Sequence, residues 1–244
     1  MTGEIETREI KKIIEKLGVD RVRNSSIIGF IKNNPISSLL TVGKSTLVKG
    51  RSDRNWVHIS SRNKNEFNKL LKELNVEDIW FASLEDWMIN ELPRTRKIEW
   101  QLTTVRYFLP CDVVIQKYKM NLTRLNSEDA LYVMNNSDYK HFLSEEYLKD
   151  RIERSFSASV RENDKPVAWA LTHDDGAIGA LHVLDGVRGK GYAQEIVCNL
   201  SYQIRNAGYI PIAQIEEKNI GAIRLFEKLG FIKDRNTTWL KLSG

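Results

Sequence analysis

Helical and strand-like hydrophobic patterns alternate along the whole chain. Isoleucines spaced among charges predict a helix over residues 5–17, ended by Gly18, and a second helix is predicted over 25–33, before Asn34-Pro35. Further along, helical spacing predicts helices at 62–74 and 84–92, and period-two alternation predicts strands at 46–48, 55–60, 78–82 and 100–108. The pattern is interrupted at residues 110–114 and then starts again.

The second half repeats this alternation. A helix is predicted to begin at Ser127, with acids in its first turn, and Asn163-Asp164 and Asp175-Gly176 are typical of hairpin turns. The remaining elements expected are strands at 118–125, 157–162, 167–172, 178–184, 210–215, 231–234 and 237–242, and helices at 143–152, 193–206 and 219–229. Two domains are therefore predicted, residues 1–114 and residues 115–244.

Composition limits where this protein is expected to act and what it is expected to bind. The 244 residues are 41% hydrophobic, and they contain no apolar run of about 18 residues, so no membrane partner is expected. The first residues are polar and acidic, unlike a secretory signal, and Cys111 and Cys198 lack metal-ligand spacing. We expect a cytoplasmic protein with reduced thiols and no metal. The net charge of +5 favours binding of an anionic ligand, or it reflects a basic surface without a specific role.

The segment Arg188-Gly189-Lys190-Gly191-Tyr192-Ala193 stands between a predicted strand and a predicted helix. Glycines let the backbone approach a phosphate, and the free N–H groups of a first helical turn point at it. The basic residues add positive charge. This turn predicts a site for a phosphorylated cofactor.

Two other phosphate motifs fit less well. Val42-Gly43-Lys44-Ser45-Thr46 resembles a Walker sequence, but Ser38 stands where the upstream glycine is required. A dinucleotide fingerprint needs a third glycine, and that position is Gln194.

A second motif follows the turn. Asn219 opens a predicted helix that Leu229-Gly230-Phe231 closes. Together with Arg188-x-x-Gly191-x-Ala193, in this order and spacing, it resembles the GNAT superfamily of acyl-CoA-dependent acyltransferases over residues 120–244. The run 166–171, followed by Asp175-Gly176, is similar to the glycine N-acyltransferase branch.

The resemblance implies a fold and a cofactor site. The fold would be α+β in three α/β layers, with two GNAT-like domains in tandem, each a mixed, mostly antiparallel sheet flanked by helices. The N-terminal copy would be degenerate, without the cofactor turn, and the C-terminal copy would splay two parallel strands. Acetyl-CoA or CoA would lie in that splay. Its contacts would be His182, Val183, Leu184, Arg188, Gly189, Lys190, Gly191, Tyr192, Ala193, Asn219 and Phe226.

Catalytic candidates rest on chemistry near the splay. Glu217, then Glu216, then His182 are the candidate bases that would deprotonate an amine. Both acids could equally be solvated loop residues, His182 a core residue, and Asn219 only a helix cap. Phe226 stands where many relatives have a tyrosine that protonates the leaving thiolate, so Tyr192 or Tyr202 would have to replace it, or the thiolate leaves unprotonated.

Two functions from different classes follow. The first is an N-acyltransferase (EC 2.3.1.-) acting on the primary amine of a small molecule or amino acid, with acetyl as the expected acyl group. The second is a catalytically silent acyl-CoA-binding regulatory protein. Nucleic-acid binding is not expected, because basic and aromatic residues do not interleave.

Overall fold

The computed structural model describes residues 7–93, 95–137, 140 and 143–244. The chain forms two compact units, Met1–Arg106 with Arg235–Gly244, and Tyr107–Asp234. The last strand thus packs with the N-terminal unit, whereas the sequence predicts one domain over residues 115–244. The assignment of the two halves as degenerate and catalytic copies stays a prediction.

The N-terminal unit is a mixed sheet with the strand order β1-β2-β3-β4-β10-β5. Strand β2 pairs antiparallel with β1 and β3, β4 pairs antiparallel with β10, and β3 runs parallel to β4. Its elements are α1 Thr7–Leu17, α2 Ser25–Asn33, β1 Ile36–Val42, β2 Ser45–Arg51, β3 Asn55–Ser60, α3 Lys64–Leu71, β4 Trp80–Leu84, α4 Asp86–Ile89, β5 Ile98–Phe108 and β10 Ile232–Leu242, with a 3₁₀ turn at Gly18–Asp20.

Both faces of this sheet are buried. Because successive side chains of a strand point to opposite faces, Leu47 of β2 packs with Phe67 and Leu70 of α3, and Val48 packs with Ile27 and Ile31 of α2. Helices therefore cover both sides of the N-terminal sheet.

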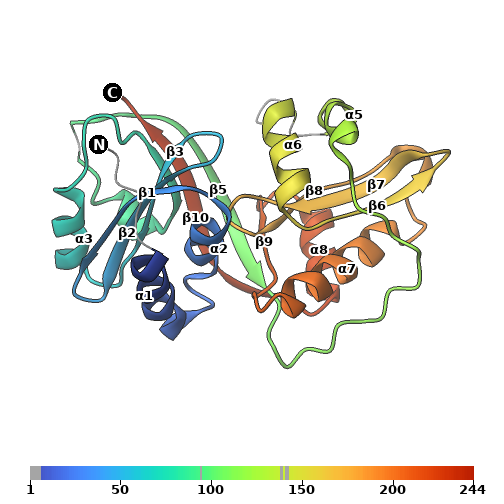
Figure 1. Cartoon of the computed structure of the whole chain (residues 1–244), viewed down its shortest axis with the longest axis horizontal. Coiled ribbons are helices and arrows are strands. Elements are labelled where there is room, and N and C mark those ends of the chain that lie inside the picture. Colours follow the sequence, from blue (N-terminus) through green and yellow to red (C-terminus); the bar gives the residue numbers. More distant parts are fainter. Residues whose placement is uncertain (1–6, 94, 138–139, 141–142) are drawn as a thin grey trace. The chain divides into compact units, whose positions relative to one another are not determined.

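The C-terminal unit carries the strand order β9-β8-β7-β6, in which β6, β7 and β8 are antiparallel and β8 is parallel to β9. Figure 1 shows α5 and α6 on one face of these strands and α7 and α8 on the other. Its elements are α5 Ala130–Asn135, α6 Glu145–Arg154, β6 Ser157–Glu162, β7 Lys165–Thr172, β8 Ile178–Val183, α7 Tyr192–Asn206, β9 Ile212–Ile215 and α8 Ile220–Lys228, with 3₁₀ turns at Ser127–Asp129 and Asp185–Val187.

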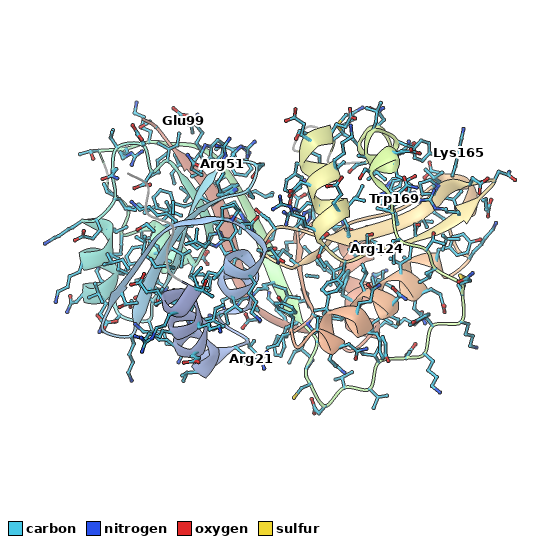
Figure 2. The ribbon with its side chains drawn as sticks, viewed as in Figure 1. Arg21, Arg51, Glu99, Arg124, Lys165 and Trp169 are labelled. Carbon is cyan, nitrogen blue, oxygen red and sulfur yellow. The ribbon has the colours of Figure 1, made fainter. Side chains whose placement is uncertain are left out.

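Trp169 is the centre of the core under α5 and α6. Its side chain, labelled in Figure 2, is fully buried and packs with Leu148 and Ile152 of α6 and Val133 of α5. The opposite face of the sheet is covered by the apolar side of α7, which includes Ile196 and Leu200. The three-layer arrangement confirms the predicted fold class.

Two differences from the predicted elements matter. The strand expected at 118–125 is irregular, because Glu195 takes the N–H groups of Lys119 and Met120, and a single bridge pairs Thr123 with Ser159. The two strands expected at 231–234 and 237–242 are one strand, β10. Ile5 of the first predicted helix lies outside the described residues.

Among the described residues, no helix is long and apolar enough to cross a membrane.

Candidate functional site

The turn between β8 and α7 has the backbone geometry that a phosphate site needs. Gly189 and Gly191 both have φ of +82°, a left-handed conformation that residues with a side chain rarely adopt. A Cβ atom at either position would meet no heavy atom within 4 Å. The two glycines therefore present bare backbone to open space.

The beginning of α7 is also uncapped. The first-turn N–H groups of any α-helix have no intrahelical partner. In this fifteen-residue helix the N-cap is Gly191, which has no side chain to accept from them. Helix α3 of the N-terminal unit, which follows strand β3, differs: the Asn63 side chain accepts the N–H groups of Asn65 and Glu66 at its beginning. Of the two helices, α7 is therefore the one whose first amides stay open for an anion.

The cations of the turn are held by surface acids. Arg188 pairs with Asp185 at 2.8 Å, and both side chains are largely exposed. Lys190 Nζ lies 3.6 Å from Glu162 Oε1, to which the Tyr192 hydroxyl also donates at 3.3 Å. Exposed pairs of this kind stabilise a protein by less than about 1 kcal/mol, so a phosphate could take over these partners at little cost.

The parallel strands beside the turn separate. Ile178 is aligned with Ala213, and this is the one aligned pair between β8 and β9, both of which are described in full. Further along β8, the register with β7 shifts, because Ala180 and Leu181 together oppose Ala170, and Ala180 has φ of +48°. This is a β-bulge, which bends its strand and interrupts pairing.

The bulge leaves backbone groups of β8 without a strand partner on one side. The Leu184 N–H donates to Val167 O of β7 at 3.0 Å, which occupies it. Since antiparallel pairs alternate between exchanging both hydrogen bonds and exchanging none, the backbone of Val183 points away from β7, toward the β9 side. Arg188 Nε donates to Val183 O at 3.2 Å. Of the three predicted backbone contacts, Val183 is the one that faces the splay.

The candidate base His182 belongs to the face covered by α5 and α6. Its ring stacks on Trp169, with centroids 5.0 Å apart and planes 28° apart. It is partly buried and lies opposite Trp169 across the β7–β8 pair. This packing fits the core interpretation of His182.

The two candidate acids lie directly after β9 and differ in their surroundings. Glu216 is largely buried and pairs with Lys218 at 2.9 Å. Glu217 is exposed, and its charge contributes to the raised pKa of Tyr107, after the larger effects of burial and of Glu227. Glu217 is therefore the acid that stays open to solvent.

The second motif has a structural role in α8. Asn219 Oδ1 accepts the N–H of Ala222 at 3.1 Å, which makes Asn219 the N-cap. Phe226 is buried, and its ring meets Phe231 edge-on at 4.9 Å. Phe226 therefore packs the core under α8 and offers no proton.

The tyrosines proposed as substitutes for that proton donor are placed differently. Tyr192 lies at the turn itself, with its hydroxyl on Glu162. Tyr202 is ten residues further along α7, about 15 Å at the rise of an α-helix, and its ring contacts Tyr118. Tyr202 is thus too far from the turn to serve a group bound there.

Sequence reasoning missed three features of this site. The bulge in β8 places its positive φ on Ala180 and not on the preceding Gly179, and Glu162 of the β6–β7 hairpin lies far from the turn in sequence. The third is the segment 116–120, which lies beside α7 because Gln194 Nε2 donates to Gln116 Oε1 at 3.1 Å and Glu195 accepts from Met120. Periodicity carries no signal for any of these contacts.

Comparison with known proteins supports this assignment of the fold. Residues 158–240 match the model of a family described as FR47-like protein. Two solved structures cover almost the whole chain. A Drosophila protein is 15% identical, with a TM-score of 0.81 over 98% of this chain and 97% of its own. A putative GNAT-family acetyltransferase from Novosphingobium aromaticivorans is 14% identical, with a TM-score of 0.60 over 92% and 97%.

A third structure, an acetyltransferase of the GNAT family from Colwellia psychrerythraea, is 13% identical, with a TM-score of 0.55 over 98% of each chain. No curated protein matches the sequence significantly. The glycine N-acyltransferase branch stays a prediction. The chain is thus similar in fold, along nearly its whole length, to solved acetyltransferases of the GNAT family, and its residues 158–240 match the FR47-like model.

Proposed function

We propose that this protein is an acyl-CoA-dependent N-acyltransferase, which moves an acyl group, by default acetyl, to the primary amine of a small molecule or amino acid. The observation that carries the proposal is the open glycine turn at 188–193 beside the bulged end of β8. Bare amides at Gly189 and Gly191, with Arg188 and Lys190 beside them, suit the pyrophosphate of CoA.

The remaining contacts with acyl-CoA would be made where β8 and β9 separate. Acyl-CoA, when bound, supplies a thioester carbonyl that an amine can attack, with the CoA thiolate leaving. The backbone of Val183 faces the open side of β8, where it could pair with the amides of the pantetheine arm. A backbone donor aimed at a developing oxyanion contributes about 3 kcal/mol to such a reaction.

Direct transfer fits better than a cysteine intermediate. Burial, with a smaller effect of Glu195, raises the pKa of Cys198 to about 11, so its thiol stays protonated at neutral pH. A protonated buried thiol is a poor nucleophile. We therefore propose that the amine attacks in a ternary complex, and that Glu217 is the residue that removes its proton.

A second function is favoured by one observation. Phe226 is buried and has no hydroxyl, so a silent acyl-CoA-binding protein would need no change in this structure. The two functions share the turn and differ in turnover.

The test measures thiol release from acetyl-CoA with and without a panel of amino acids and small amines. Arg188→Glu should raise the Kd for CoA about tenfold or more, because it places like charge at the pyrophosphate. Arg51→Glu, the same charge change at an exposed position at the end of β2, is the control.

The outcomes separate the candidates. Amine-dependent release that Arg188→Glu abolishes supports the transferase. Saturable CoA binding without release supports the silent binder. An unchanged Kd in Arg188→Glu contradicts the assignment of the turn, and absence of both binding and release contradicts both functions.

A further inference from the structure

The N-terminal unit has a cavity of its own at the carboxyl ends of its two parallel strands. His58 lies near the end of β3 and Ser83 near the end of β4, and both line the cavity. The carboxyl ends of adjacent parallel strands are where ligand sites form in sheets with crossover helices. The topology therefore gives the N-terminal unit a second location suited to a ligand, separate from the turn at 188–193.

Two polar side chains of this cavity have no hydrogen-bond partner. Neither ring nitrogen of His58 is bonded, although the residue is only 3% exposed, and its ring is packed on Phe30 at 4.2 Å. The buried Ser83 hydroxyl is likewise unpaired, and Ser83 has φ of +55° in the left-handed region. Buried polar atoms are nearly always bonded, and strained residues gather at functional sites.

The charged residues that line the cavity are mostly cationic. They are Arg23, Arg106 and Arg235, with Glu85 as the one carboxylate among the lining residues. Glu85 Oε1 accepts from Arg235 at 3.0 Å and from Arg23, and Arg106 Nη1 donates to the carbonyl of Arg23 at 3.0 Å. Two of the three guanidinium groups thus pair with the one acid, and the third donates to a backbone carbonyl.

The pKa shifts of Arg23 and His58 agree with a cavity lined mostly by hydrogen-bond donors. Burial lowers the pKa of Arg23, Glu85 opposes that effect, and Arg235 and Arg62 add to it. Burial also lowers the pKa of His58 to about 3, so the imidazole is neutral at physiological pH and keeps one N–H donor. Guanidinium, imidazole N–H and hydroxyl donors are the groups that bind oxyanions.

We propose that this cavity of the N-terminal unit binds the carboxylate or phosphate group of a small molecule, held by its arginines, His58 and Ser83. The cavity volume of about 30 Å³ exceeds the roughly 10–15 Å³ that one water molecule needs, so oxygen atoms of such a group can enter it. The ligand would satisfy the imidazole N–H and the Ser83 hydroxyl, and its negative charge would add to that of Glu85. The site does not depend on the proposed acyltransferase activity.

The test titrates the full-length protein with malonate and, separately, with inorganic phosphate, at constant ionic strength, and follows the Tm and the heat of binding. His58→Leu removes both ring nitrogens and keeps an apolar group against Phe30. Ser83→Gly removes the hydroxyl and suits the positive φ. Arg51→Gln, a change at an exposed arginine that is labelled in Figure 2 and lies outside the cavity lining, is the control.

We expect saturable binding of at least one anion to the wild type and to Arg51→Gln, weakened about tenfold or more in His58→Leu and Ser83→Gly. Binding of malonate alone identifies a carboxylate ligand, and binding of phosphate alone identifies a phosphate ester. CoA affinity should be unchanged in both cavity variants. Absence of saturable binding of either anion, or equal binding in all four proteins, would overturn the proposal.

Discussion

The carboxylate of Glu195 accepts the backbone N–H of Met120 at 3.0 Å, and it also accepts the N–H of Lys119. Glu195 lies in the first turn of α7, where a negative charge also interacts favourably with the helix dipole. These contacts attach the irregular segment 116–120 to the helix that begins at the proposed phosphate turn. One side chain therefore orders a segment that forms no strand ladder.

Replacing Glu195 by alanine should loosen that segment. Two N–H groups lose their acceptor, so the free energy of unfolding should fall by about 1–2 kcal/mol. Hydrogen exchange at residues 119 and 120 should accelerate more than exchange in α7. Glu128→Ala, a change of an exposed acid in a 3₁₀ turn, is the control and should leave exchange at 119 and 120 unchanged. Equal exchange in both variants would contradict this role.

Gly191→Ala should impair CoA binding beyond its effect on stability. Gly191 and Gly208 have nearly the same positive φ, +82° and +80°, and both face open space, so alanine at either should cost about 1 kcal/mol of stability. Gly191 precedes α7, whereas Gly208 follows it. The Kd for CoA, measured by calorimetry, should rise in Gly191→Ala and stay unchanged in Gly208→Ala. A parallel change in both would assign the effect to folding alone.

Local signals determined which elements could be predicted from the sequence. The bounds of α2, β3 and β6 agree with the prediction, since Asn34-Pro35 ends the helix and Asn163-Asp164 makes a turn with two positive φ angles. The strand expected at 118–125 failed because a distant side chain, Glu195, took its N–H groups.

The two proposed ligand sites also differ in how far the sequence predicts them. The turn at 188–193 is one continuous segment with two glycines, so the sequence alone predicted it. The cavity of the N-terminal unit brings together Arg23, Arg106 and Arg235, which are spread over more than two hundred residues. No periodicity relates such positions, so only the fold could bring them together.

Glu217→Gln should lower kcat by about a hundredfold or more if this acid removes the amine proton, as proposed. Glu216→Gln is the matched control, since Glu216 is paired with Lys218 and largely buried. Full activity in both variants would make the two acids solvated loop residues, and loss in Glu216→Gln alone would move the role to that residue.

Phe226→Tyr tests whether a proton donor is missing. Phe226 is only 3% exposed and packs on Phe231, so an added hydroxyl without a partner should reduce stability by about 1–2 kcal/mol. The CoA thiolate is a tolerable leaving group without protonation, so kcat should stay within about twofold. The measurement compares thiol release in the two proteins at saturating acetyl-CoA. A tenfold increase in kcat would show instead that the wild type lacks a general acid.

His58 should make the protein less stable in mild acid. Burial lowers the pKa of His58 from 6.5 to about 3 in the folded chain. Between these values the unfolded chain binds a proton that the folded chain does not, so the free energy of unfolding falls as the pH drops below 6.5, by about 1.4 kcal/mol per pH unit. His58→Leu removes this contribution and also removes two unpaired buried nitrogens, so it should match or exceed the wild type at pH 7. Urea unfolding at pH 7, 6 and 5 should then show a stability difference in favour of His58→Leu that widens as the pH falls. A parallel decline of the two proteins over this range would mean that His58 takes up its proton in the folded chain as well, and would contradict this prediction.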